Sequence, residues 1–175
     1  MSWMQTYKGR AFDPFAVESF DFDIEEIAHG LSQECRFGKQ STSFYSVAEH
    51  SVYVSRLANR PKWGLLHDID EFILPDIPKP IKHLGLCEGF LTVAEQMRDR
   101  ASIQFDLGPY PKSHIDKVEW WLMQTERQSV MADVAPGQGL EDWARGEGPN
   151  IKIACLNPKA AKAFFLTEAS KLGLY

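Results

Sequence analysis

Residues of the types that bind divalent metals occur close together in the first half of the chain. His67 and Asp68 are adjacent in the segment GLLHDIDEF, and His50 precedes them in the segment SVAEH. Imidazole nitrogens and carboxylate oxygens suit divalent transition metals. Adjacent side chains of a helix point about 100° apart, so together with ligands from other elements they can hold an ion from one side. The pattern therefore predicts a metal site that uses His50, His67 and Asp68.

The apolar residues around these three explain why packing is not their expected role. In a helical reading of residues 65–73, the apolar side chains form one arc, and His67, Asp68 and Glu71 fall on the opposite arc. His50 instead lies in the middle of an apolar face, where its ring nitrogens need partners. A backbone carbonyl is the ordinary partner of a lone histidine. The adjacent His-Asp pair favours a metal.

Four stretches of the chain resemble the HD-domain phosphohydrolases, whose ligands run His, then His-Asp, then a distal Asp. They are DIEEIAHGLSQECRFG, SFYSVAEHSVYVSRL, GLLHDIDEFILPDIPKPIK and IDKVEWWLMQTER, and the resemblance covers roughly residues 1 to 131. They look like the small HD proteins of bacteria and phages. That group includes 5'-deoxynucleotidases and phage-encoded dATP triphosphohydrolases.

The resemblance implies a role for each matching residue. It implies metal ligands at His50, His67, Asp68 and Asp116, acidic residues that position or activate water at Glu71 and Asp76, a phosphate contact at Arg36 and a sugar contact at Phe37. The chain departs from the family at Pro75, where glycine is frequent, at residues 39–41, and in its shorter spacing between the two histidines. These departures bear on nucleotide preference more than on chemistry.

Several of these residues also have a simpler structural explanation. Ser113 and Asp116 fit a capping box, in which the carboxylate would bond a free backbone N–H. Trp120 and Met123 lie on the same side of that helix, which favours an inward carboxylate that needs a cation. Asp70 is expected to be a solvated surface acid, and His29 a hydrogen-bonded helix residue.

Three lysines leave the size of the substrate open. Lys39, Lys79 and Lys82 are either surface charges or contacts to a polyphosphate, and as contacts they offer more positive charge than one phosphate needs. The resemblance and this charge together favour hydrolysis of a deoxynucleoside triphosphate, of the dATP type, to nucleoside and triphosphate. The alternatives are a 5'-deoxynucleotidase that acts on monophosphates and, in a different class, a non-catalytic nucleotide-binding HD module.

The expected chemistry fits these residue types. A divalent ion lowers the pKa of bound water and neutralises phosphate charge. Nitrogen and oxygen ligands without thiolate fit Zn, Co or Mn, with Mg also possible. Glu71, about one helical turn from His67, would orient or deprotonate the attacking water.

The elements that must position these residues are predicted to be helices. Capping signals, apolar periodicity and proline breaks predict helices over about 23–33, 46–59, 62–73, 87–105, 113–131 and 158–171, with a short helical piece in the loop at 75–82. Residues 1–22 form an N-terminal arm with room for a hairpin. Residues 133–150, rich in Gly and Pro, form an excursion with one helical turn at 140–144. The prediction is an all-α, single-domain HD-type bundle of about six to seven helices.

Composition limits the remaining possibilities. A chain of 175 residues with 44% hydrophobic residues has the length and composition of one globular domain. The net charge of −5 and the absence of a basic run argue against nucleic-acid binding. No apolar run approaches the ~20 residues of a membrane span, no secretory signal is visible, and three widely spaced cysteines favour reduced thiols, so a cytoplasmic location is expected.

Large aromatic side chains predict self-association. Trp120 and Trp121 are expected in the core or at a subunit interface rather than as stacking platforms. Together with Phe164 and Phe165 they provide more apolar surface than a small domain needs to bury. The expected assembly is a homo-oligomer, either a dimer or a hexamer.

Overall fold

The computed structural model describes residues 3–82, 85, 87–138 and 146–175, without the side chains of residues 79 and 80. Three helices begin directly after a polar residue that caps them: α1 (Ile24–Gln33) after Asp23, α2 (Val47–Leu57) after Ser46 and α7 (Pro158–Lys171) after Asn157. Each cap side chain accepts a hydrogen bond from a free backbone N–H of the first turn. The predicted starts of these helices are confirmed.

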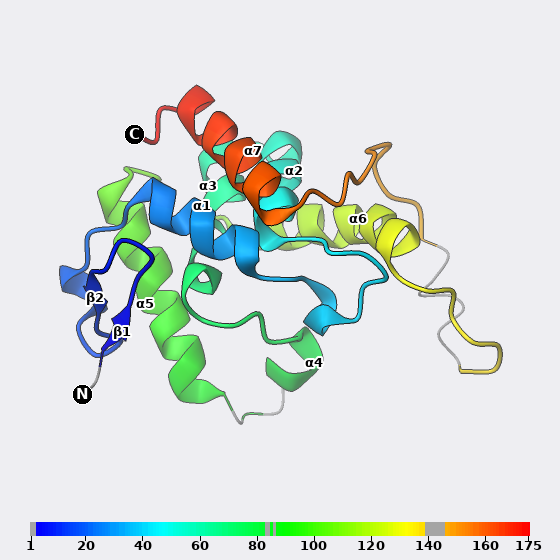
Figure 1. Cartoon of the computed structure of the whole chain (residues 1–175), viewed down its shortest axis with the longest axis horizontal. Helices are drawn as coiled ribbons and strands as arrows, with labels where there is room; N and C mark the ends of the chain where they lie inside the picture. The colour runs from blue at the N-terminus through cyan, green and yellow to red at the C-terminus, as the bar shows by residue number, and fades with distance from the viewer. Residues whose placement is uncertain (1–2, 83–84, 86, 139–145) are drawn as a thin grey trace.

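The other elements complete a mostly helical, compact chain. They are β1 (Met4–Gln5), β2 (Ala11–Phe12), η1 (Val17–Ser19), η2 (Phe37–Lys39), α3 (Pro61–Leu66), η3 (Ile69–Phe72), α4 (Lys79–Lys82), α5 (Glu88–Gln104) and α6 (Lys112–Val130). The predicted arm contains the small antiparallel hairpin β1–β2, and the loop at 75–82 contains the short helix α4. Figure 1 shows α7 lying along α1, with the hairpin at one end of the molecule and α6 at the other.

The predicted helix over 62–73 is wrong in its middle. α3 ends at Leu66, and the chain passes through His67 and Asp68 before the 3-10 helix η3 begins. His67 is still helical, with φ −64° and ψ −32°, whereas Asp68 has φ −101° and ψ 30°. The break turns both side chains toward α2 and α6, and it also buries Asp70 and Glu71.

Close backbone contacts hold this break against its neighbours. A Cβ atom added at Gly64 would lie 2.7 Å from Cα of Ser55, so glycine lets α3 pack directly on α2. A Cβ at Gly30 would lie 1.9 Å from the carbonyl oxygen of Phe72, which brings α1 onto η3. These two contacts fix the distance between the His50 helix and the turn that holds His67.

Two hydrophobic clusters support the bundle. The larger lies among α1, α2, α3, η3 and α7, and includes the fully buried Phe165. The smaller joins α2 to α6 through residues such as Tyr45, Ile115 and Leu122. Since Phe165 is part of the core, it is not available for a subunit interface as the sequence suggested.

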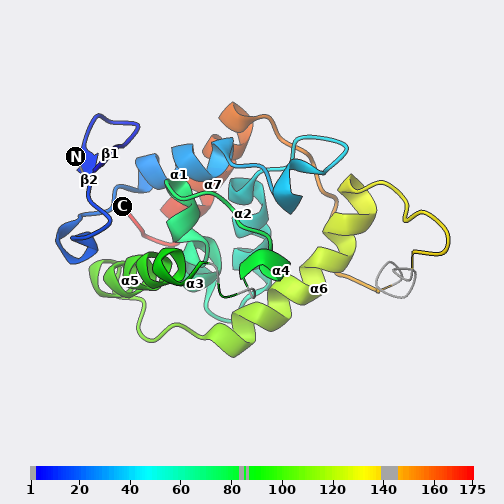
Figure 2. The same ribbon diagram turned by 90° about the horizontal axis from the view of Figure 1, so that it is seen from below.

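Glu49 ties the chain before α7 to the first turn of α2. Its buried carboxylate accepts hydrogen bonds from the backbone N–H groups of Ala154 and Leu156, both 2.8 Å, and from the Tyr53 hydroxyl at 3.0 Å. Residues 131–138, which follow α6, extend away from the helical body, as both views show (Figures 1 and 2). The predicted helical turn at 140–144 lies outside the described residues. In the part of the chain that is described, no helix is long and apolar enough to cross a bilayer.

Candidate metal centre and adjoining cavity

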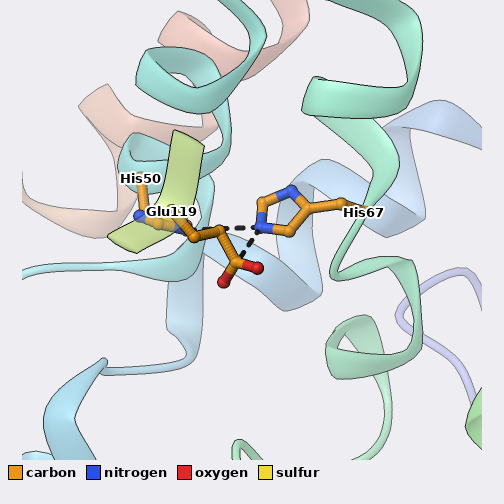
Figure 3. A group of neighbouring side chains, drawn as sticks. All are labelled: His50, His67 and Glu119. Atoms are coloured by element: carbon orange, nitrogen blue, oxygen red, sulfur yellow. Dashed lines mark hydrogen bonds and ion pairs between the residues drawn. The ribbon is translucent and has the colours of Figure 1, made fainter. Parts of the chain in front are cut away.

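His50 and His67 face each other in the interior between α2 and the turn after α3. Both side chains are buried, and their Nε2 atoms lie 3.2 Å apart. Figure 3 shows the two rings with the carboxylate of Glu119, which comes from α6. The three residues form a group whose ligand atoms all lie within 4.8 Å of one another.

The outer nitrogen of each ring is already occupied. Nδ1 of His67 lies 2.8 Å from the carbonyl oxygen of Gly64, and Nδ1 of His50 lies 2.5 Å from Oε1 of Glu126. A carbonyl or an ionised carboxylate can only accept, so each Nδ1 carries the proton. Both Nε2 atoms would then present lone pairs to each other. This arrangement requires a cation between the rings, either a proton or a metal ion.

Neighbouring charges favour His67 over His50 as the ring that carries the proton. Burial opposes its protonation, but the carboxylates of Asp68 and Glu119 outweigh burial and raise the pKa of His67 to about 9. Burial and the charge of Arg36 lower the pKa of His50. Without metal, one proton on His67 therefore satisfies the pair, and a divalent ion would displace it.

Two carboxylates complete the group. Oδ2 of Asp68 lies 3.1 Å from Nε2 of His67 and 3.9 Å from Nε2 of His50. Oε1 of Glu119 lies 3.9 Å from Nε2 of His67. Ligand bonds of about 2.0–2.2 Å place the ligands of one ion roughly 3 to 4 Å apart. The spacing of His50, His67 and Glu119 could hold a single divalent ion, and Asp68 lies within 4 Å of both histidines but is not part of that closest group.

Asp68 is held ionised by its surroundings. Burial alone would favour the neutral acid, but His67, His50 and Arg36 keep the pKa of its carboxyl well below the usual range. A carboxylate that stays charged in a partly buried position is a suitable ligand, because it offsets the charge of a cation.

Asp116 does not belong to this group. Its carboxylate is 46% exposed and lies 2.9 Å from Nζ of Lys112 on the outside of α6. The capping-box alternative also fails, because α6 begins after Pro111 without a side-chain cap. The predicted face of the helix was correct, since Trp120 and Met123 border the site. The carboxylate that reaches the histidines lies about one turn further along, at Glu119.

Glu126 is a functional residue that the sequence reasoning missed. Its fully buried carboxylate lies 2.6 Å from the Tyr45 hydroxyl, 2.5 Å from Nδ1 of His50 and 3.3 Å from a guanidinium nitrogen of Arg36. Burial would raise the pKa of Glu126, but Arg36 and His50 outweigh it and lower the value to about 2. A signal was present in the sequence, because positions 118, 122, 126 and 130 form one helical stripe that is apolar except at Glu126.

Replacing Glu126 by glutamine is expected to weaken metal binding about 10- to 100-fold, because the carboxylate fixes the tautomer of His50 and increases its basicity. Metal affinity can be measured by competition with a chromophoric chelator. Glu95→Gln, which removes an exposed carboxylate on α5, is the matched control and should bind metal like the wild type. Equal affinity in both variants would show that Glu126 only supports the fold.

A cavity of about 470 Å³ opens beside the metal-binding group. Its charged lining consists of Arg36, Asp68, Glu71, Asp76, Lys82 and Glu119, and its apolar lining includes Phe37, Ile77, Pro78, Trp120 and Met123. Of the residues predicted to bind substrate or activate water, Arg36, Phe37, Glu71, Asp76 and Lys82 are therefore brought together. Lys39 is exposed and does not line the cavity, and the side chain of Lys79 lies outside the described residues.

Glu71 is the most unusual acid in this cavity. It is only 5% exposed, Nζ of Lys82 lies 3.6 Å from its Oε1, and its buried Oε2 has no hydrogen-bond partner among the described residues. Burial, followed by the charges of Asp68, Asp76 and Asp70, raises its pKa well above the ordinary value. Such a carboxylate holds a proton more tightly than a solvated one, which is the property of a general base.

Arg36 and Phe37 enter the cavity from a left-handed turn. Phe37 and Lys39 have φ of 56° and 67°, on either side of Gly38 at 58°. Each non-glycine residue in this conformation costs about 1 kcal/mol or more. The guanidinium of Arg36 lies 3.7 Å from Asp68 Oδ2, and its buried Nε has no partner among the described residues. Arg36 also lines the cavity, where its guanidinium could contact an anion.

Asp70 is not the solvated acid that the sequence suggested. It is 3% exposed, and its Oδ1 lies 2.9 Å from a guanidinium nitrogen of Arg98 on α5. Burial is the main cause of its raised pKa. Asp70 fastens η3 to α5, and so supports the turn that presents His67 and Asp68.

Fold and site together define a mostly helical protein with a buried group of histidine and carboxylate side chains that could hold a divalent metal beside an open cavity. No family model matches the chain. It is 30% identical over 135 residues to the uncharacterized protein YfdR of Escherichia coli K12, a match that covers 76% of this chain and 75% of YfdR. The chain belongs to the same family as YfdR.

A second relative is an uncharacterized protein of Rhodobacter capsulatus, RCAP_rcc00048. It is 32% identical over 117 residues, which cover 61% of this chain and 59% of that protein. Neither name states an activity. The functional argument for this chain therefore depends on its own site.

Proposed function

We propose that this protein is a metal-dependent phosphohydrolase that removes phosphate from 5'-deoxynucleotides, with an HD-type arrangement of ligands. The observation that carries the proposal is the pair of facing Nε2 atoms of His50 and His67, 3.2 Å apart with both Nδ1 atoms already bonded. The carboxylate of Glu119 belongs to the same close group, and that of Asp68 lies 3.1 Å from Nε2 of His67, so anionic ligands for a divalent cation are at hand. A proton alone does not explain why four ligand-type residues converge beside a cavity.

The residues around the group suit hydrolysis of a phosphate ester. A divalent ion held there would supply a lowered pKa for water and a positive charge for phosphate oxygens. Glu71 would accept the proton of the attacking water, since it lies in the cavity wall with one oxygen unpaired. Arg36 and Lys82 would bind phosphate oxygens, and Asp76 would orient water from the same loop.

The charges that line the cavity favour a monophosphate over a triphosphate. Its described lining includes two cationic side chains, Arg36 and Lys82, and four acidic ones. Arg36 already lies near Glu126 and Asp68, and Lys82 near Glu71. The preference for a triphosphate depended on three lysines, of which Lys39 does not line the cavity. We therefore favour the 5'-deoxynucleotidase alternative. The predicted homo-oligomer stays a prediction.

Chelation is expected to abolish the activity. Protein treated with EDTA and then dialysed should release no orthophosphate from dAMP or dTMP, and Zn, Co or Mn should restore the release. The same proteins should be tested with dATP for triphosphate release, which we expect to be slower. Turnover that is unaffected by chelation, in protein without metal by elemental analysis, would contradict the proposal. Tight nucleotide binding without product under every metal would favour a non-catalytic binding module.

A further inference from the structure

We infer that Trp120 is the stacking platform for the base of the nucleotide, and that the site accepts different bases. This inference rests on the proposed function and adds the part of the substrate that lies away from the phosphate. Trp120 follows Glu119 on α6 and lines the cavity, yet it is 60% exposed. Most of its indole surface is therefore not buried by the fold.

Three elements each contribute a charged residue and then an apolar one to the cavity. These pairs are Arg36–Phe37 before and in η2, Asp76–Ile77 in the loop before α4, and Glu119–Trp120 on α6. Each of these three elements thus contributes both a charged and an apolar side chain to the cavity wall. A ligand that fits both has a charged group and an apolar face, as a nucleotide has in its phosphate and its base.

Trp120 is the largest of these apolar side chains and has the broadest flat surface. Every base has a π face, so stacking on an indole adds affinity without selecting a particular base. The apolar residues that share the wall, Phe37, Ile77, Pro78 and Met123, carry no side-chain group that could read the edge of a base by strong hydrogen bonds. The apolar part of the wall therefore offers a base a packing surface without base-specific hydrogen bonds. This departs from the adenine preference that the resemblance implied.

Trp121 provides a matched comparison. It is the next residue on α6, it is 47% exposed, and it is not part of the cavity lining. Exposure of a tryptophan alone thus does not distinguish the two positions. If the exposed indoles only served an interface between subunits, removing either one would have the same kind of effect. If Trp120 binds the base, its replacement alone should change nucleotide affinity.

The experiment compares Trp120→Ala and Trp121→Ala with the wild type, each loaded with the same divalent metal: Zn, Co or Mn. Substrates are dAMP, dTMP and 2-deoxyribose 5-phosphate, which lacks a base. Trp120→Ala should raise KM for both nucleotides about ten- to hundredfold, the range expected for one lost stacking contact. KM and kcat for the sugar phosphate should not change, which also shows that the adjacent Glu119 is undisturbed. Trp121→Ala should resemble the wild type with all three compounds.

Calorimetric titration of the same metal-loaded proteins with dAMP separates this inference from the proposed function. If the wild type releases phosphate from none of the three compounds, the proposed function fails. The affinity for dAMP still decides the role of Trp120. A dissociation constant that rises in Trp120→Ala but not in Trp121→Ala supports the inference. Equal affinity of all three proteins for dAMP would overturn the inference. A rise in KM of Trp120→Ala for 2-deoxyribose 5-phosphate as large as its rise for the nucleotides would also overturn it.

Discussion

Replacing Glu71 by glutamine is expected to slow phosphate release on the order of 10²- to 10⁴-fold while the protein keeps its metal. Glutamine has nearly the same size but cannot accept the proton of water. Glu71 lines the cavity, whereas the facing ring nitrogens are approached by Asp68 and Glu119. Its loss should therefore affect the chemical step and not the ligands.

The pH dependence provides a second measurement on the same variant. Because burial and neighbouring carboxylates raise the pKa of Glu71, its carboxylate is protonated at low pH and becomes a base as pH rises. Activity of the wild type should rise with pH along this limb, and the limb should be absent from the residual activity of Glu71→Gln. Metal content by elemental analysis should equal that of the wild type. A Glu71→Gln protein that had lost its metal would refute this division of roles.

Asp68→Ala is the counterpart, because it removes a ligand and not a base. Metal and activity should be lost together, since Glu119 alone would then supply the negative charge that offsets the cation. Glu71→Gln and Asp68→Ala should both lose activity, but Glu71→Gln should keep its metal and Asp68→Ala should lose it.

Local signals in the sequence predicted most of the helices correctly. The caps Asp23, Ser46 and Asn157 and the prolines of the loop at 75–82 act within a few residues, so they can be read without knowledge of the fold. The break after Leu66 has no comparable signal. It depends on how α3 packs on α2 at Gly64, a contact between distant parts of the chain.

The same difference between local signals and long-range contacts explains which residues of the candidate site were predicted. His50, His67 and Asp68 were found because their types and spacing are unusual. Helical periodicity groups residues 116, 119 and 120 on one side of α6, but of these Glu119 and Trp120 line the cavity, whereas Asp116 is 46% exposed beside Lys112. Which of them reaches His67 depends on where α6 crosses the site, and periodicity does not contain this information. Asp70 was misjudged for a similar reason, because its partner Arg98 lies 28 residues away on α5.

Glu119→Ala is expected to remove metal and activity, whereas Asp116→Ala should retain both. Glu119 is 14% exposed and directs a carboxylate toward the histidine pair, and it lies on the cavity wall. Asp116 is on the outer surface and forms an i,i+4 ion pair with Lys112. Such a pair contributes about 0.3–0.5 kcal/mol, so its loss should hardly change the thermal midpoint.

The two variants decide between two assignments of the last ligand. The resemblance to HD-domain enzymes implies Asp116, and the geometry favours Glu119. Loss of a direct ligand should reduce metal affinity by more than the 10- to 100-fold expected for Glu126→Gln, which changes only the support of a ligand. Affinities of Glu119→Ala and Asp116→Ala are therefore measured by the same chelator competition, and circular dichroism checks that both fold. If Asp116→Ala lost the metal and Glu119→Ala kept it, α6 would have to turn by roughly 60° and shift by about 4.5 Å along its axis. A helix fixed by Ile115, Val118 and Leu122 in the core does not allow this without repacking, so we expect Glu119 to be the ligand.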